Sequence, residues 1–180
     1  MGKDVSLNVY PKDYVVVDIE TTGLSPDKSE IIEISAIKVI NGSEEETFSR
    51  LIKPKGRVSS FITSLTGITN SMLENAFDLE NVLTEFKNFS DGYVIMGHNV
   101  KFDIRFLNFY MQKILEKPFD NDYIDTLRVS RKLLPKLRSH RLGILAEYYG
   151  IDTRGMHRAL KDCEVTNYCY NQMINVSMPA

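Results

Sequence analysis

The stretch YVVVDIETTG, from Tyr14 to Gly23, combines a strongly apolar strand pattern with two acids at its end. Its three consecutive valines are typical of a strand that runs into a hydrophobic core. Asp18 and Glu20 stand where this strand ends, and residues two apart on a strand point to the same face. Two carboxylates side by side repel each other and are costly to bury unless a cation lies between them. The pattern therefore predicts a cation site, with a solvated strand end followed by turn residues as the plain alternative.

A third acid lies in the stretch GHNVKFDIRFL, from Gly97 to Leu107. Asp103 falls in the first turn of an otherwise apolar helix, where the helix dipole alone also favours an acid. His98 and Asn99, at the preceding strand end, are candidates either for substrate contacts or for structural hydrogen bonds. Because strand ends open a crevice in an α/β sheet, we expect this acid to lie near the first two.

The fourth acid and a histidine come from HRALKDCEVT, which begins at His157. Residues five apart within a helix diverge by roughly 140°. His157 and Asp162 can therefore meet only if Asp162 lies on the helix and His157 on the loop before it. Four acids and one histidine are what a two-metal phosphodiesterase needs, because carboxylates suit Mg²⁺ or Mn²⁺ and an imidazole can take a proton from water. A lone histidine is otherwise more often a surface or structural residue.

The rest of the pattern predicts an α/β domain with a mixed five-stranded sheet and helices on both faces. Strands are expected at residues 14–19, 31–40, 47–52, 93–96 and 123–125. Helices are expected in short pieces at 59–75, then at 79–89, 101–116, after the fifth strand up to Pro135, and at 141–149 and 159–175. The Asn41-Gly42 pair is a strong hairpin signal, so the first three strands should form an antiparallel meander before two parallel strands.

Composition sets the class of protein. The 180 residues, 43% hydrophobic and 26% charged, suit a single domain at 1–180 with a core at about 13–175. A net charge of −2 means that any nucleic-acid strand is gripped locally. The acid-free basic run from Arg128 to Arg141 could contact phosphates or simply form a solvated helix face. Cys163 and Cys169 do not face each other on a helix, and no apolar run approaches 18 residues, which favours a cytoplasmic protein without a membrane partner.

Several motifs together carry a family likeness. They are DIETTGL at 18–24, LTGIT at 65–69, GHNVKFDIRFL at 97–107, IDTLRVSRKLLP at 124–135, LGILAEYYGI at 142–151 and HRALKD at 157–162. In this order they resemble the DEDDh class of 3′→5′ exonucleases, which are DnaQ-like proteins with an RNase H-like fold. Within the class the sequence is most similar to the proofreading epsilon subunit of bacterial DNA polymerase III and to PolC-type exonuclease domains.

The resemblance implies a metal-dependent exonuclease that removes mononucleotides from the 3′ end of single-stranded or mismatched DNA. It implies that Asp18, Glu20, Asp103 and Asp162 hold two Mg²⁺ or Mn²⁺ ions, with Asp103 acting partly through a bound water. His157 would be the general base. The implied substrate-binding residues are Thr21, Gly23, Leu24, Leu65, Thr66, Ile68, His98, Asn99 and Phe102.

Two other functions remain open on the sequence. An enzyme of the same class could trim RNA 3′ ends, and an inactive RNase H-like module could only bind a partner, although such modules usually lose one or more of the acids that are intact here. The expected partners are single-stranded DNA or frayed 3′ ends, with RNA as the alternative, and a DNA polymerase. Epsilon subunits carry a C-terminal tail that tethers them to the polymerase, whereas this chain ends near its last expected helix. Action alone and membership of a longer protein are therefore both open.

Overall fold

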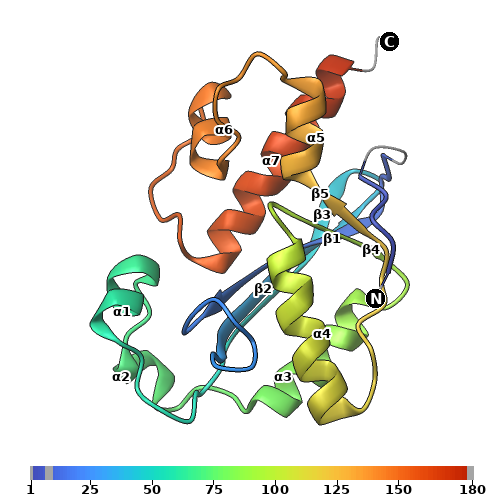
Figure 1. Cartoon of the computed structure of the whole chain (residues 1–180). Helices are drawn as coiled ribbons and strands as arrows, with labels where there is room; N and C mark the ends of the chain where they lie inside the picture. The colour runs from blue at the N-terminus through green and yellow to red at the C-terminus, as the bar shows by residue number, and fades with distance from the viewer. Residues whose placement is uncertain (1, 7–9, 178–180) are drawn as a thin grey trace.

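A five-stranded sheet in the order β3-β2-β1-β4-β5 forms the centre of the computed structural model (Figure 1). The strands are β1 (Tyr14–Thr21), β2 (Ile31–Ile40), β3 (Ser43–Leu51), β4 (Val94–Gly97) and β5 (Tyr123–Asp125). The first three pair antiparallel, and β4 and β5 run parallel to β1. The predicted mixed sheet is therefore confirmed, with β1 at its middle.

The structure describes residues 2–6 and 10–177. Met1, residues 7–9 and residues 178–180, which belong to the predicted 1–180 domain, lie outside the described residues. Within the described part of the chain, no helix is both long and apolar enough to cross a membrane.

Strand β3 begins earlier than predicted, directly after the Asn41-Gly42 turn. Both turn residues have positive φ, 53° and 80°, as a tight hairpin of this type requires. Ser43, the first residue of β3, is followed by three glutamates, Glu44 to Glu46, which disfavour a strand by propensity. They are exposed on the edge strand, where charge also discourages pairing with another chain. Position at the sheet edge thus overrides their low propensity.

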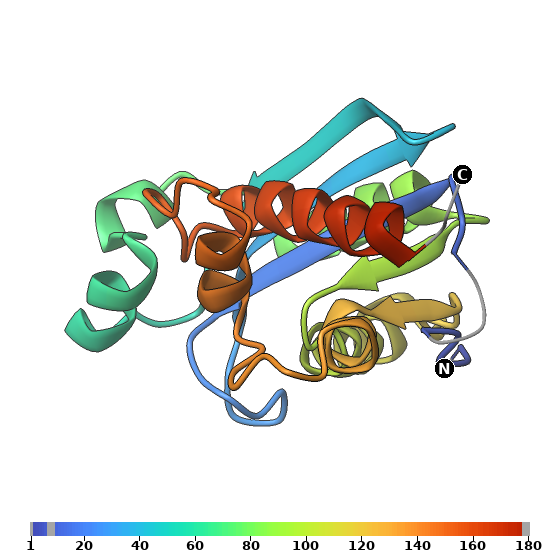
Figure 2. The same ribbon diagram turned by 90° about the horizontal axis from the view of Figure 1, so that it is seen from above.

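Helices cover both faces of the sheet (Figure 2). The first layer contains α3 (Leu79–Ser90) and α4 (Lys101–Leu115), and the second contains α5 (Thr126–Leu133), α6 (Leu142–Tyr148) and α7 (Ala159–Ser177). Strand β1 contributes side chains to the hydrophobic core on both faces of the sheet. Val15 and Val17 pack beneath α3 and α4, whereas Tyr14 and Val16 pack against α7. Burial on both faces explains why the valine run is continuous instead of alternating.

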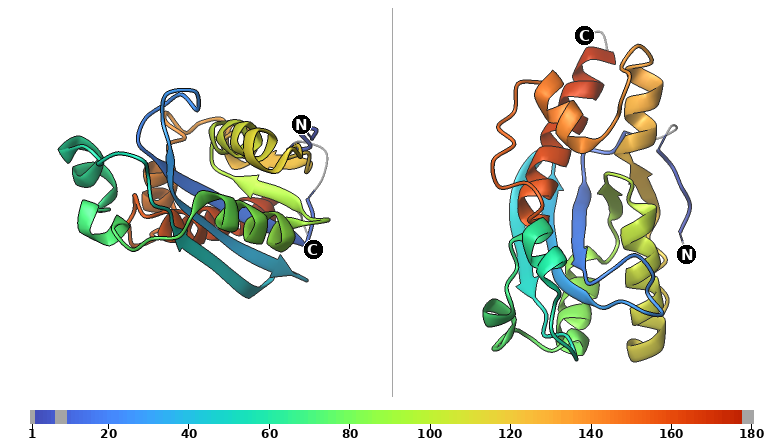
Figure 3. Two further views of the ribbon diagram at one scale, coloured as in Figure 1. Left: turned by 90° about the horizontal axis from the view of Figure 1, so that it is seen from below. Right: turned by 60° about the vertical axis from the view of Figure 1, so that its left-hand side comes forward.

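Two short helices, α1 (Ser60–Thr66) and α2 (Asn70–Leu73), stand to one side of the sheet (Figures 1 and 3). Gly67 separates them with a left-handed φ of 72°, and its N–H closes α1 on the carbonyl of Thr63. The break at Gly67 divides the segment 59–75 into the short helical pieces predicted there.

The N-terminal segment adds a contact that the sequence did not predict. Tyr123 of β5 exchanges backbone hydrogen bonds with Lys3 and Val5, and Asp125 N–H donates to the hydroxyl of Ser6 over 2.8 Å. The segment therefore covers the free edge of β5.

Candidate active site

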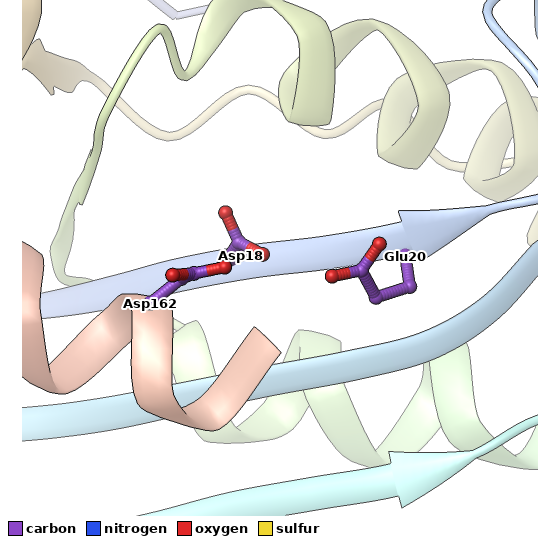
Figure 4. Close-up of side chains that lie close together, drawn as sticks. All are labelled: Asp18, Glu20 and Asp162. Atoms are coloured by element: carbon purple, nitrogen blue, oxygen red, sulfur yellow. The ribbon is translucent and has the colours of Figure 1, made fainter. Parts of the chain in front are cut away.

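Three carboxylates converge at the end of the central strand. Asp18 and Glu20 come from β1 and Asp162 from the first turn of α7 (Figure 4). One ligand oxygen from each lies within 4.8 Å of the others. The buried Oδ1 of Asp162 has no hydrogen-bond partner among the described residues, a costly state for an acceptor. Oxygen donors grouped in this way fit a divalent cation such as Mg²⁺ or Mn²⁺.

Proton affinities in this cluster are strongly disturbed. Burial, followed by repulsion from Asp162, raises the pKa of Glu20 to about 8. Burial and then the charge of Asp103 raise the pKa of Asp18 well above its ordinary range. The pKa of Asp162 is also raised, mainly by burial. The ionised cluster is thus unstable by itself, and a bound cation would favour the ionised carboxylates.

Asp103 lies beside this cluster but outside the three-acid set. It is 5% exposed in the first turn of α4, and its Oδ1 accepts a hydrogen bond from Ile19 N–H over 3.1 Å. Burial raises the pKa of this carboxyl too. Asp103 therefore connects α4 to β1 next to Asp18, and its role as a metal ligand stays a prediction.

His157 lies on the loop before α7, where the sequence placed it. Its backbone N–H donates to Asp162 Oδ2 over 3.0 Å, and its φ of 67° is left-handed. The side chain is exposed and lines a cleft of about 620 Å³ together with Asp18 and Asp162. The position suits a general base for this cleft, a role that remains a prediction.

Two charged residues of the site were missed by the sequence reasoning. Glu33 lies on β2 directly opposite Glu20 and is 1% exposed. Its carboxylate is bound by the guanidinium of Arg158, the residue after His157, with Nη2–Oε1 at 2.8 Å. The sequence did contain a signal for this pair. Glu33 lies inside the apolar run IIEISAIKVI, and a carboxylate buried there is costly unless it has a partner.

The predicted pocket residues fall into two groups. Leu24 and Leu65 are 80% and 45% exposed, and Phe102 is partly buried on α4. By contrast, Thr66 bonds the carbonyl of Ile62, and Ile68 is fully buried in the core under α1 and α2. Of Leu65, Thr66 and Ile68, only Leu65 has an exposed side chain that a ligand could contact.

The loop after β1 is tightly built around Thr21 and Gly23. The hydroxyl of Thr21 donates to the carbonyl of Gly23 over 2.6 Å. A Cβ at Gly23 would come within 2.5 Å of the Ser29 hydroxyl, so any larger residue there would displace the Ser29 side chain. These two residues shape the loop that presents Leu24.

His98 and Asn99 have structural bonds and also line a cleft. His98 Nδ1 lies 3.0 Å from Thr126 Oγ1, and Asn99 N–H donates to Asp125 Oδ1 over 2.9 Å. Burial lowers the pKa of His98 to about 4, so its imidazole is neutral at pH 7. Both residues line a second cleft, of about 710 Å³. His98 and Asn99 therefore have structural hydrogen bonds, one of the two roles the sequence allowed. Their contact with substrate stays a prediction.

Basic side chains surround this second cleft. Arg131, Arg138 and Arg141 line it, and Arg141 with Leu142 also lines the cleft that holds Asp18 and His157. The basic run noted in the sequence thus faces the space next to the acids.

Comparison with known proteins gives a consistent family. The profile of the RNase_T family, described as an exonuclease family, matches residues 15–170. The epsilon subunit of DNA polymerase III from Aquifex aeolicus is 40% identical over 159 residues, which are 88% of this chain and 79% of that subunit. The PolC-type DNA polymerase III of Thermotoga petrophila is 40% identical over 163 residues, covering 91% of this chain but 12% of the polymerase.

A solved structure agrees in fold. The nuclease domain of 3′hExo, a DEDDh family member bound to rAMP, superposes with a TM-score of 0.79 and 24% identity, over 93% of this chain and 94% of that domain. The chain therefore has the predicted RNase H-like fold.

Proposed function

The chain belongs to the exonuclease family, and from this premise we propose that it is a 3′→5′ exonuclease that removes mononucleotides from single-stranded or mismatched DNA. The observation that carries the proposal is the grouping of ligand oxygens from Asp18, Glu20 and Asp162 within 4.8 Å. The three acids come from two segments that are distant in the sequence. Burying their ionised carboxylates together is unfavourable unless a cation is bound between them. An inactive binding module has no need of such a costly arrangement.

We propose that Asp18, Glu20, Asp103 and Asp162 hold two Mg²⁺ or Mn²⁺ ions. When bound, the ions supply positive charge that stabilises the attacking and leaving oxygens of an in-line displacement. His157, exposed at the rim of the same cleft, accepts the proton of the attacking water. The hydrogen bond from the His157 backbone N–H to Asp162 Oδ2 keeps the His157 backbone beside the acids.

The substrate proposal follows from the surfaces around the cluster. Leu24 and Leu65 offer exposed apolar contact for one unstacked terminal base. Arg131, Arg138 and Arg141 offer positive charge for the phosphates of the strand that follows. A pocket of this kind favours single strands and mismatched ends, because unpairing a terminal nucleotide costs on the order of a few kcal/mol.

DNA is the favoured substrate because both reported sequence relatives are DNA polymerase III proteins. The PolC relative suggests a DNA polymerase as a partner, either in one longer chain or as a separate subunit. The domain assignment to 1–180 and a cytoplasmic location belong to the same proposal, and the free, buried Cys163 and Cys169 suit a reducing compartment. RNA is the second candidate, since the structural relative 3′hExo holds rAMP.

The proposal is tested with a DNA single strand labelled at its 5′ end. With Mg²⁺ we expect a ladder of labelled products that shorten one nucleotide at a time, and no products with EDTA. A mispaired 3′ end should be shortened faster than a paired one. Cleavage of a circular single strand would contradict the exonuclease assignment. An RNA oligomer of the same sequence decides the substrate, since faster shortening of RNA would favour the second candidate.

A further inference from the structure

The loop that carries His157 is held at both sides by carboxylates of the site. On one side, His157 N–H donates to Asp162 Oδ2 over 3.0 Å. On the other, the N–H of Ala159, the first residue of α7, donates to Glu33 Oε2 over 3.2 Å. Because Ala159 opens the helix, its N–H has no partner within α7, and Glu33 supplies one from a different element.

Glu33 is also joined to Arg158 through a two-point contact. Arg158 Nη2 lies 2.8 Å from Oε1, and its Nε lies 3.3 Å from Oε2. The Glu33 side chain is 1% exposed and that of Arg158 is 40% exposed. A buried carboxylate facing Glu20 across two strands would be strongly disfavoured without this cation. The pair is therefore required at this place, and it fixes the residue next to His157.

The backbone of His157 is strained. Its φ of 67° lies in the left-handed region, which is unfavourable for a residue with a side chain. Such a conformation persists only when the surroundings impose it. Arg158 and Ala159, the two residues directly after His157, both donate hydrogen bonds to the Glu33 carboxylate, and this restraint does not involve the proposed metal ligands.

We propose that Glu33 and Arg158 are positioning residues, which hold the His157 backbone in its left-handed conformation and so aim the imidazole into the cleft. The inference rests on the proposed function, in which His157 acts as the base. It assigns to β2 a part in the reaction, although Glu33 is neither a proposed metal ligand nor in contact with substrate. Loss of the pair leaves the acids in place but frees the loop.

The test is a double-mutant cycle between Arg158→Ala and His157→Ala under single-turnover conditions. Alone, Arg158→Ala should lower the rate constant of nucleotide release by roughly 10–100-fold, the scale of a misplaced catalytic group. In the His157→Ala background it should lower the rate by less than about threefold, since the group it positions is already gone. Arg158→Lys keeps the charge without the two-point contact and should retain more activity than Arg158→Ala.

The loop itself offers a matched control. Arg154 forms an exposed pair with Asp152, with Nη2–Oδ2 at 2.6 Å and an arginine side chain that is 90% exposed. Arg154→Ala removes the same kind of side chain and should leave the rate unchanged. Equal losses from Arg158→Ala in both backgrounds, or full activity of Arg158→Ala alone, would overturn the positioning role.

A second measurement does not depend on activity or metal. Amide hydrogen exchange at His157 and Ala159 in the metal-free protein should be faster in Arg158→Ala and Glu33→Gln than in the wild type, and unchanged in Arg154→Ala. Unchanged exchange in both pair variants would overturn the inference. If the wild type shows no nuclease activity, the proposed function fails, and the exchange data alone judge whether the pair holds the loop.

Discussion

Two tyrosines packed together in the core differ in one hydrogen bond. The rings of Tyr14 and Tyr170 meet edge to face at 5.6 Å. The hydroxyl of Tyr14 donates to Asn167 Oδ1 over 2.8 Å, whereas the buried hydroxyl of Tyr170 has no partner among the described residues. We expect Tyr170→Phe to raise the free energy of unfolding by about 1 kcal/mol, because an unpaired buried hydroxyl is costly.

Tyr14→Phe is the matched control for this prediction. It removes the 2.8 Å bond to Asn167 Oδ1, which keeps only a longer bond of 3.4 Å from Asn171 Nδ2, and it should lower the free energy of unfolding by about 1 kcal/mol. Urea denaturation of both variants measures the two effects at one interface. A loss of stability in Tyr170→Phe equal to that in Tyr14→Phe would mean that the Tyr170 hydroxyl is bonded.

Glu20 predicts how the stability of the metal-free protein depends on pH. Its folded pKa is raised from 4.5 to about 8, chiefly by burial, so the folded state holds a proton that the unfolded state releases. The stabilisation is complete below pH 4.5 and is lost as the pH rises towards 8. Thermal unfolding in EDTA should therefore show a decline over this range that is shallower in Glu20→Gln. The same slope in the variant would contradict the raised pKa.

At the scale of elements, Gly97 controls how closely β4 and β1 approach. A Cβ at this position would lie 2.9 Å from the carbonyl oxygen of Val17 and 2.6 Å from Val100 Cγ2. Gly97→Ala must displace β1 just before Asp18, so we expect a loss of about 1–3 kcal/mol in stability. Gly143, inside α6, has nothing within 4 Å of the position that a Cβ would take. Gly143→Ala should therefore be neutral or slightly stabilising when the thermal unfolding of both variants is measured. Equal stability of the two variants would refute the close approach.

The elements also show what the sequence could predict. Strand β1 was recognised from its continuous run of valines, which pack on both faces of the sheet. The loop position of His157 followed from helix geometry together with the expectation that His157 meets Asp162. The start of β3 was missed because its glutamates are tolerated only on an edge strand, which local pattern does not reveal. The Glu33–Arg158 pair joins residues 125 positions apart, and the N-terminal contact with β5 is equally remote in sequence. Such partners are set by the tertiary fold.

For the whole molecule, the acid cluster means that the folded protein should depend on a divalent ion for part of its stability. A ligand that binds only the native state stabilises it by mass action. For a chain of 180 residues, Mn²⁺ at about 100 times its dissociation constant should raise the melting temperature by roughly 5–10 °C. The shift measures the site directly, without assuming any substrate.

The decisive measurement is this Mn²⁺-induced shift in the wild type, in Asp18→Asn and in the control Asp91→Asn, which removes an exposed acid at the end of α3. Asp18→Asn should lose most of the shift, yet be no less stable than the wild type without metal, because one of several repelling charges has been removed. Asp91→Asn should keep the full shift. If Asp18→Asn and the wild type are stabilised equally by Mn²⁺, the carboxylates at the end of β1 are not the metal site, and the account of this protein as a metal-dependent exonuclease is contradicted.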